Sequence, residues 1–407
     1  MTHIIEKQRE TNVIESCDIL VAGGGIAGIS AAIAGARAGA KVVLVEKECL
    51  LGGLATLGLV TIYLPLCDGM GRQVSFGISE ELLHLSIKNG VEARYPKPWL
   101  EGGSLKEKTE TRFLVQYNPH LFALEAERLL LSLGVEILYD TLICETAESG
   151  DKITHIIIEN KSGRNAIAVK SVIDCTGDAD ICELSQADTV LFTQKNILAG
   201  WYYYLTDGEL KLRMLGAADI PDEQRTAENT PKLLSEARFT GIDGEEISRM
   251  LCMSHEAMLR DILEKRIGDK SHTPVTTPTI PQLRMTRRLD GAYTMSDTES
   301  HTYFEDSVGL IGDWRKRGPV YEIPFRTLYG NKVKNLLTAG RCISVTDSMW
   351  DISRVIPACA VTGEAAGIAA SITDDFSSID IKELQHRLAQ NNVVLHESEL
   401  DNYNGQQ

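Results

Sequence analysis

The sequence lacks the patterns that mark several classes of protein. Its nine cysteines are scattered singly and none forms a C-x-x-C pair, so a disulfide framework is not predicted. No grouping of His, Cys and Asp has metal-ligand spacing, and no nucleophilic triad signature is present. The first ten residues, MTHIIEKQRE, hold no apolar core typical of a signal peptide. These absences predict a cytoplasmic protein with reduced thiols and no bound metal.

Positive charge is also scarce. The chain has 41 Lys and Arg residues against 57 Asp and Glu residues, a net charge of −16. An acidic surface repels phosphate backbones, so nucleic acid is not an expected partner.

Two uncharged runs, 19–36 and 50–67, each reach eighteen residues, a length that could cross a membrane. The first belongs to the motif described next. The second contains Gly52, Gly53, Gly58 and Pro65, which disfavour a continuous helix. We expect it to be a buried segment that faces a cofactor, and we expect no membrane span.

The most informative motif is a Gly-rich turn between two apolar segments. From Asp18 to Lys47 the chain reads DILVAGGGIAGISAAIAGARAGAKVVLVEK. This predicts a strand ending at the turn, a helix over about 27–38, and a second strand over 42–45 that ends on Glu46. A G-x-G-x-x-G pattern in this context is the dinucleotide-binding fingerprint. The alternative is a Gly-rich turn that binds no ligand.

Each part of the fingerprint has a physical task. We expect Gly23 to permit the tight turn, Gly25 to let the backbone approach a pyrophosphate, and Gly28 to let the helix pack on the strand. The helix N-terminus, with Ile26 and Ala27, would receive the phosphate charge. Glu46 would accept hydrogen bonds from ribose hydroxyls.

The remaining chain predicts a discontinuous nucleotide domain. Its 407 residues suit two domains. Residues 57–112 are expected to be irregular, and Asn118-Pro119 opens an amphipathic helix. The strand-to-glycine pattern recurs at 172–178 and 336–341, and a small-residue helix is expected to begin at Gly363. The predicted domains are a nucleotide domain of 1–62, 117–190 and 331–385, a substrate or cap domain of 63–116 and 191–330, and a C-terminal helix and tail of 386–407.

NAD and FAD both use the opening fingerprint, so the downstream segments must distinguish them. Three of these read VIDCTGDADICELSQAD, LRMTRRLDGAYTMSD and AGRCISVTDSMWDISRVIPACAVTGEAAGIAAS. They resemble the bacterial FAD-dependent oxidoreductase family, which has a glutathione-reductase-like flavin domain and is related to the fumarate reductase flavoprotein group. The resemblance implies an α/β fold: a Rossmann-like FAD-binding domain with an inserted α+β substrate (cap) domain. A second G-x-G-x-x-G is missing, so NAD(P) is not the expected redox partner.

The resemblance also implies a set of FAD-binding residues. Gly363, as the start of a helix, would aim its N-terminus at the flavin carbonyl beside N1; the alternative is close helix packing. Arg341 replaces the acidic residue usual after the last glycine of such domains, and would pair with a flavin phosphate or with Asp178. The full predicted set is Gly23, Gly25, Ile26, Ala27, Gly28, Glu46, Lys47, Gly53, Leu54, Ala55, Ile143, Thr176, Gly177, Asp178, Gly340, Arg341 and Gly363.

Arg354 is the candidate catalytic residue. It precedes Gly363 by nine residues and could bind a substrate carboxylate or donate a proton, as an arginine does in fumarate reductases; the alternative is an ion pair with Asp347 or Asp351. Other polar and aromatic candidates have structural alternatives that we favour. They are Arg284, Arg287, Arg288, Trp201–Tyr204, His255, His301, Tyr303, Cys342 and Cys359.

The resulting prediction is an oxidoreductase that transfers a hydride between non-covalently bound FAD and a small polar organic substrate, such as a hydroxy acid or sugar derivative. One alternative is a flavoprotein subunit that passes electrons to a partner protein. Another is an FAD-dependent RNA-modifying protein, which the acidic charge disfavours. The electron acceptor and any homo-oligomeric state are left open by the sequence.

Overall fold

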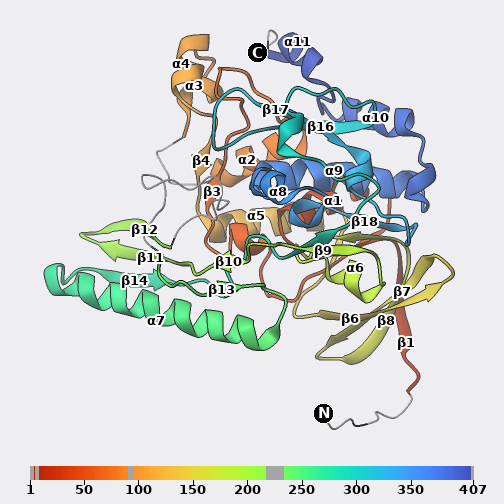
Figure 1. The fold of residues 1–407 in the computed structure, drawn as a ribbon, viewed down its shortest axis with the longest axis horizontal. Coiled ribbons are helices and arrows are strands. Elements are labelled where there is room, and N and C mark those ends of the chain that lie inside the picture. Colours follow the sequence, from red (N-terminus) through yellow and green to blue (C-terminus); the bar gives the residue numbers. More distant parts are fainter. Residues whose placement is uncertain (1–3, 5–8, 90–94, 217–232, 405–407) are drawn as a thin grey trace.

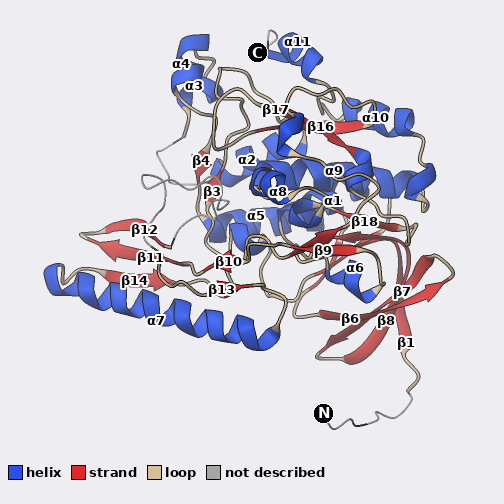
Figure 2. Ribbon diagram, in the orientation of Figure 1, coloured by secondary structure: helices blue, strands red, loops and turns tan. Residues whose placement is uncertain are grey.

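A computed structural model gives the fold, and it describes residues 4, 9–89, 95–216 and 233–404. A twisted sheet lies on one side, and a layer of helices covers it (Figures 1 and 2). A long helix, α7 (Gly244–Gly268), lies with a small sheet at the periphery. Parts of the predicted domain segments, namely 1–3, 5–8, 90–94, 217–232 and 405–407, lie outside the described residues.

The large sheet confirms the predicted α/β class. Its order is β5-β2-β1-β8-β7-β6, and β18 pairs with the end of β8. Strands β5, β2, β1, β8 and β18 run parallel, whereas β6 and β7 form antiparallel pairs. The bounds are β1 Asn12–Ala22, β2 Val42–Val45, β5 Glu136–Leu138, β6 Leu142–Ser149, β7 Lys152–Asn160, β8 Gly163–Asp174 and β18 Leu336–Thr338.

The central strands are buried because both faces of the sheet are covered. Ile19, Leu20, Val21 and Ala22 of β1 are each 0% exposed. Such continuous apolar runs are typical of parallel strands packed on two sides. The strand of 42–45 that the sequence predicted is β2.

Two helices rich in small residues lie side by side over the sheet (Figure 1). They are α1 (Ile26–Arg37) and α9 (Ile356–Ile372). A Cβ on Gly363 would lie 2.3 Å from the carbonyl oxygen of Ala27. Ser30 Oγ also donates to the Ala360 carbonyl at 2.7 Å. Only glycine permits so close an approach of the two backbones.

The predicted helix start at Gly363 is therefore wrong. Helix α9 begins at Ile356, with Pro357 in its first turn, where proline is well tolerated. Gly363 lies in the helix interior and packs against α1, which is the alternative of close helix packing. The small residues that suggested a new helix instead mark the face of α9 that contacts α1.

Residues 57–112 contain more helix than expected. Helix α2 (Ile78–Ile87) packs against α9 and α5 (Pro119–Ser132). The carboxylate of Glu364 in α9, 1% exposed, accepts a hydrogen bond from the backbone N–H of Ile78 at 2.8 Å. The Asn118-Pro119 start of α5 is confirmed, because the Asn118 side chain accepts from two backbone N–H groups.

Smaller elements fill the predicted cap segments and the periphery. In 191–330, β11 pairs with β12 and β14, and α7 packs against β11. The other described elements are α3 Lys97–Leu100, α4 Leu105–Glu110, α6 Asp180–Leu184, α8 Asp347–Ser353, α10 Ile381–Gln390, α11 Leu400–Asn404, β3 Ile62–Tyr63, β4 Val115–Gln116, β9 Thr189–Leu191, β10 Asn196–Ile197, β11 Gly200–Thr206, β12 Glu209–Leu215, β13 Arg238–Phe239, β14 Thr273–Thr276, β15 Arg287–Leu289, β16 Ser307–Gly312 and β17 Val320–Pro324.

The division into domains remains a prediction. Every strand of the large sheet comes from the predicted nucleotide segments. However, β16 and α2 come from predicted cap segments and pack against α9, so one hydrophobic core spans both. The predicted boundary at 385 falls inside α10.

Within the described part of the chain, no single helix is both long and apolar enough to cross a membrane. Helices α8 and α9 reach that length and composition only when taken together, and they are bent by 89°.

Candidate active site

A large cavity lies where the carboxyl ends of β1, β2, β8 and β18 approach the N-termini of α1 and α9. With its open mouth it encloses ≈ 1740 Å³. Open parallel sheets bind ligands at this edge. Of the predicted cofactor residues, Gly28 and Gly363 do not line the cavity. Those that do are Gly23, Gly25, Ile26, Ala27, Glu46, Lys47, Gly53, Leu54, Ala55, Ile143, Thr176, Gly177, Asp178, Gly340 and Arg341.

The three fingerprint glycines have different surroundings. Gly23 has a φ of +98°, and a Cβ there would lie 2.7 Å from the carbonyl oxygen of Cys175. A Cβ on Gly28 would lie 1.9 Å from the Gly23 carbonyl oxygen. At Gly25 a Cβ would meet nothing within 4 Å, so this position faces open space beside the helix N-terminus.

The N-terminus of α1 suits an anionic group. No side chain caps it, and its first turn has no acidic residue. Its backbone N–H groups and the positive end of the helix dipole attract a phosphate. Together with the open space at Gly25, this arrangement fits the pyrophosphate of a dinucleotide.

Glu46 lies at the end of β2 and is 6% exposed. One carboxylate oxygen accepts from the Gly24 N–H at 2.6 Å, and the other accepts from the Glu48 N–H at 2.9 Å. Burial raises the pKa of Glu46, while the two N–H donors act in the opposite direction. Each oxygen retains a further lone pair that could accept from a hydroxyl.

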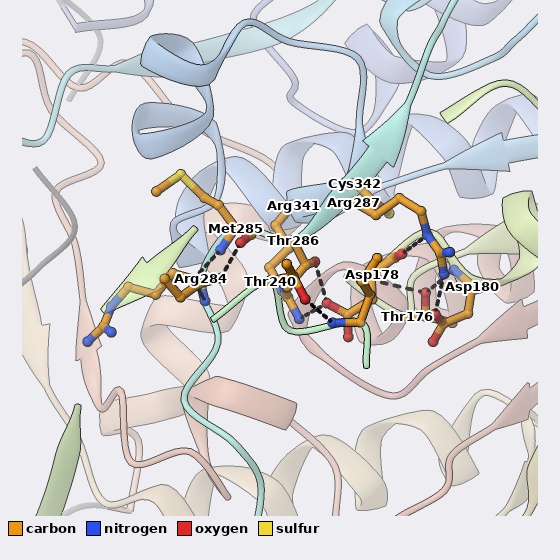
Figure 3. A network of polar contacts seen from close by, with 12 residues as sticks. Thr176, Asp178, Asp180, Thr240, Arg284, Met285, Thr286, Arg287, Arg341 and Cys342 are labelled. Atoms are coloured by element: carbon orange, nitrogen blue, oxygen red, sulfur yellow. Dashed lines mark hydrogen bonds and ion pairs between the residues drawn. The ribbon is translucent and has the colours of Figure 1, made fainter. Parts of the chain in front are cut away.

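A polar network joins the sheet edge to residues of the predicted cap segment 191–330 (Figure 3). Arg341 Nη2 lies 2.8 Å from Asp178 Oδ1, and Thr286 Oγ1 donates to the same oxygen at 2.5 Å. The predicted pairing of Arg341 with Asp178 is therefore confirmed. Arg287 forms ion pairs with Asp180 and Glu183 at 2.9 and 3.1 Å, which agrees with the structural role that we favoured for it.

Sequence reasoning missed Asp174, which shapes this turn. It is 0% exposed at the end of β8. Its carboxylate accepts from the N–H and hydroxyl of Thr176 and from the backbone N–H groups of Ile181 and Cys182. Its position directly before the C-T-G turn, at the end of an apolar strand, is the sequence signal that could have identified it.

Arg354 lies between α8 and α9 and lines the cavity. Its Nε donates to Asp351 Oδ1 at 3.1 Å, and its Nη2 forms an ion pair with the same oxygen. This is one of the alternatives stated above, although the pair is buried: the two side chains are 12% and 4% exposed. A role for Arg354 in binding substrate stays a prediction.

The residues at the N-terminus of α9 line the cavity, whereas Gly363 does not. Val355 and Ile356 line it, and the helix start has neither a side-chain cap nor an acidic residue in its first turn. This end of α9 can stabilise negative charge.

The remaining candidates are mostly structural. Arg284 lines the cavity, and its guanidinium carbon lies 5.6 Å from the Trp201 ring centroid. Figure 3 shows its side chain directed away from the Asp178–Arg341 pair. The Tyr203 hydroxyl lies 2.5 Å from Thr61 Oγ1, and exposed His301 pairs with Glu397 at 2.8 Å.

The two cysteines noted in the sequence also differ. Cys359 lines the cavity, and burial raises the pKa of its thiol to about 12. Cys342 is 0% exposed and its thiol contacts the Asp174 carbonyl at 3.3 Å. Cys342 therefore has the structural role that we favoured, as a buried packing residue. Cys359 is only partly buried and lies at the cavity wall. Among the described residues, no group of three or more His, Cys, Asp or Glu could hold a metal.

The parallel sheet, the glycine turn and the cavity at the sheet edge define a dinucleotide-binding α/β protein. Residues 18–198 and 203–388 match the family described as FAD dependent oxidoreductase. The chain belongs to this family and is an FAD-dependent oxidoreductase, as the resemblance in the sequence implied.

The chain also matches solved structures, among them p-nitrophenol 4-monooxygenase from Pseudomonas putida, at 14% identity and a TM-score of 0.47, covering 97% of this chain and 93% of that one. A flavin-dependent brominase triple mutant has 12% identity and a TM-score of 0.44, covering 92% and 85%. A geranylgeranyl bacteriochlorophyll reductase-like protein from Thermoplasma acidophilum has 13% identity and a TM-score of 0.42, covering 93% and 82%. No curated protein matches the chain.

Proposed function

We propose that this enzyme transfers a hydride between non-covalently bound FAD and a small polar organic substrate that carries a carboxylate or carbonyl group. One observation supports it most: a single cavity is lined both by the fingerprint residues and by Arg354. A cofactor held by the fingerprint residues would therefore share one cavity with a substrate held by Arg354.

The cavity residues divide into two groups by chemistry. Gly25 and the start of α1 would hold the pyrophosphate, and Glu46 would bind the adenosine ribose. The Thr176–Asp178 turn, with Gly340 and Arg341, would contact the middle of the cofactor. Gly53–Ala55 and Ile143 would complete its walls. Bound FAD supplies the hydride chemistry.

The substrate end is apolar apart from its arginines. We assign to it five apolar residues of the cavity lining that are not in the predicted cofactor set, and such side chains exclude water: Val60, Ile62, Leu64, Ile280 and Pro281. The guanidinium of Arg354 offers donors in a planar fork that matches a carboxylate. It would bind and orient the substrate, while the N-terminus of α9 would stabilise negative charge on the flavin ring.

The test is an anaerobic screen of the holoprotein against small hydroxy acids, alcohols and sugars, followed by the visible absorption of the flavin. We expect at least one carboxylate- or carbonyl-bearing compound to bleach or restore that absorption. If the flavin responds to no small molecule and is reduced only with a partner protein present, the electron-transfer alternative is correct.

A further inference from the structure

Four charged side chains of alternating sign lead from the β16–β17 turn to the cavity wall. Arg315 lies 3.1 Å from Asp313 through its Nε and, through its Nη1, 3.5 Å from Asp351 Oδ2. Asp351 in turn pairs with Arg354. The side chains of Asp313, Arg315, Asp351 and Arg354 are 0%, 19%, 4% and 12% exposed. The two carboxylates are thus buried, and the two arginine side chains are mostly buried.

The Asp351 carboxylate is shared between two guanidinium groups. Its Oδ1 contacts Nε and Nη2 of Arg354, and its Oδ2 faces Arg315. Nη1 of Arg354 has no hydrogen-bond partner among the residues that the structure describes. Since Arg354 lines the cavity, this group remains for a ligand.

Further contacts hold the turn that carries Arg315, one with α8 and two with Arg112. The Trp314 indole N–H donates to the Asp351 carbonyl at 2.9 Å. Arg112 donates to the carbonyls of Asp313 and Trp314 at 3.2 and 3.1 Å. Arg315 therefore keeps a fixed place relative to Asp351.

Electrostatics give this placement a consequence. A buried pair of one arginine and one carboxylate is neutral, so it attracts an anion weakly. A second guanidinium on the other carboxylate oxygen of Asp351 neutralises part of the carboxylate's negative charge. Less of that charge then offsets Arg354, so the surroundings of Arg354 are more positive. Asp313 offsets part of the charge of Arg315 through Nε and Nη2, whereas Nη1 is the nitrogen that faces Asp351.

We propose that Arg315 is a positioning residue that fixes Asp351 and thereby sets the affinity of Arg354 for a substrate carboxylate. Arg315 does not line the cavity, so it would act on the substrate only through Asp351 and Arg354. The inference rests on the proposed function, because it takes Arg354 as the anion-binding group.

The test titrates the oxidised holoprotein with butyrate and benzoate and follows the flavin absorption and the heat of binding. Butyramide and benzamide are neutral controls of the same shape. The variants are Arg354→Gln, Arg315→Gln and Arg315→Lys. Arg326→Gln is the matched control, because it removes the same charge from an arginine that pairs with Asp306 at 2.9 Å and does not line the cavity.

We expect the wild-type protein to bind a carboxylate but not its amide, and Arg354→Gln to abolish binding. Arg315→Gln should weaken binding by about tenfold, within the range of coupling between members of one ion-pair network. Arg315→Lys should restore part of this loss, and Arg326→Gln should leave binding unchanged. FAD content should be equal in all variants.

Removing Arg315 leaves two buried carboxylates short of a partner, which destabilises proteins. If Arg315→Gln does not fold, the double variant Asp313→Asn with Arg315→Gln is used in its place, because it removes both charges. We expect the same weakening of carboxylate binding from it. If Arg354→Gln abolishes binding but neither Arg315 variant weakens it, the inference is wrong while the proposed function stands. Equal weakening by Arg315→Lys and Arg315→Gln also overturns the inference. If neither carboxylate binds the wild-type protein, Arg354 is not a carboxylate-binding group. That result overturns the inference and the assignment of a substrate carboxylate to Arg354, whereas hydride transfer itself is tested by the substrate screen.

Discussion

Gly25 offers the sharpest test of the cofactor site, because a side chain there would enter the cavity without disturbing the fold. Its φ of −68° and ψ of −176° are open to any residue. A Cβ at this position meets nothing within 4 Å. The valine of Gly25→Val would therefore stand where we place the pyrophosphate, and it would block that group from the first N–H donors of α1.

The expected loss follows from the contacts that the side chain blocks. Hydrogen bonds to a charged group contribute about 1.5–3 kcal/mol each. The loss of two gives roughly 3–6 kcal/mol, or about 10²- to 10⁴-fold in the Kd for FAD. Stability of the apoprotein should change by only about 1 kcal/mol, the usual range for a substitution at a helix N-cap.

The assay is titration of apoprotein with FAD, followed by flavin fluorescence, together with thermal unfolding of the apoprotein. Gly244→Val is the control, because Gly244 is exposed at the start of α7 and its Cβ also meets nothing within 4 Å. Gly28→Ala is the contrasting variant: its Cβ would lie 1.9 Å from a carbonyl oxygen, so it should destabilise the apoprotein itself. Near-normal FAD affinity in Gly25→Val would show that the pyrophosphate lies elsewhere.

Three further predictions concern single carboxylates and Arg354. Glu46→Ala should weaken FAD binding by roughly one to two decades through loss of charge-assisted bonds to the ribose; an unchanged Kd would place the adenosine elsewhere. Arg354→Lys keeps the charge but loses the planar fork, so turnover of a substrate found in the screen should fall sharply while FAD content persists, and full turnover would refute the assignment. Burial raises the pKa of Glu364 from 4.5 to about 8, so the folded protein binds the extra proton and loses stability as the pH rises through this window. In the wild-type protein the free energy of unfolding should fall by on the order of 4 kcal/mol between roughly pH 5 and pH 9, and Glu364→Gln should not show this fall. Urea unfolding measures it, and wild-type and variant curves of unfolding free energy against pH that run parallel would contradict the prediction.

Local patterns predicted the first part of the fold well. The strand, glycine turn, helix and second strand of 18–45 lie where the spacing placed them, because each is determined by neighbours in sequence. The start of α5 followed from Asn118-Pro119 for the same reason. In contrast, Gly363 was placed at a helix start because small residues can mark either a terminus or a close helix contact. Only the position of α1 distinguishes the two.

The charged residues behind Arg354 show where sequence reasoning stops. Asp313 and Arg315 lie in a turn about forty residues before Arg354, and no spacing rule links them to it. They meet because β16 packs on α9, so the turn after β16 comes to lie against α8. The sequence did give both outcomes for Arg354, a substrate contact and an ion pair with Asp351. The structure shows the ion pair at the wall of the cavity, so the two outcomes are compatible.

The packing of α1 on α9 links the two ends of the cavity. Both helices begin at its wall, and the glycine contacts hold their N-termini at a fixed separation. The first N-terminus is the proposed pyrophosphate site and the second follows directly after Arg354. Because a glycine contact fixes backbone against backbone, it leaves little freedom for one helix to shift along the other. A larger residue at Gly363 would thus move the substrate end relative to the cofactor end, even though Gly363 lines neither. This is why we assign Gly363 a part in the geometry of the site rather than in binding FAD.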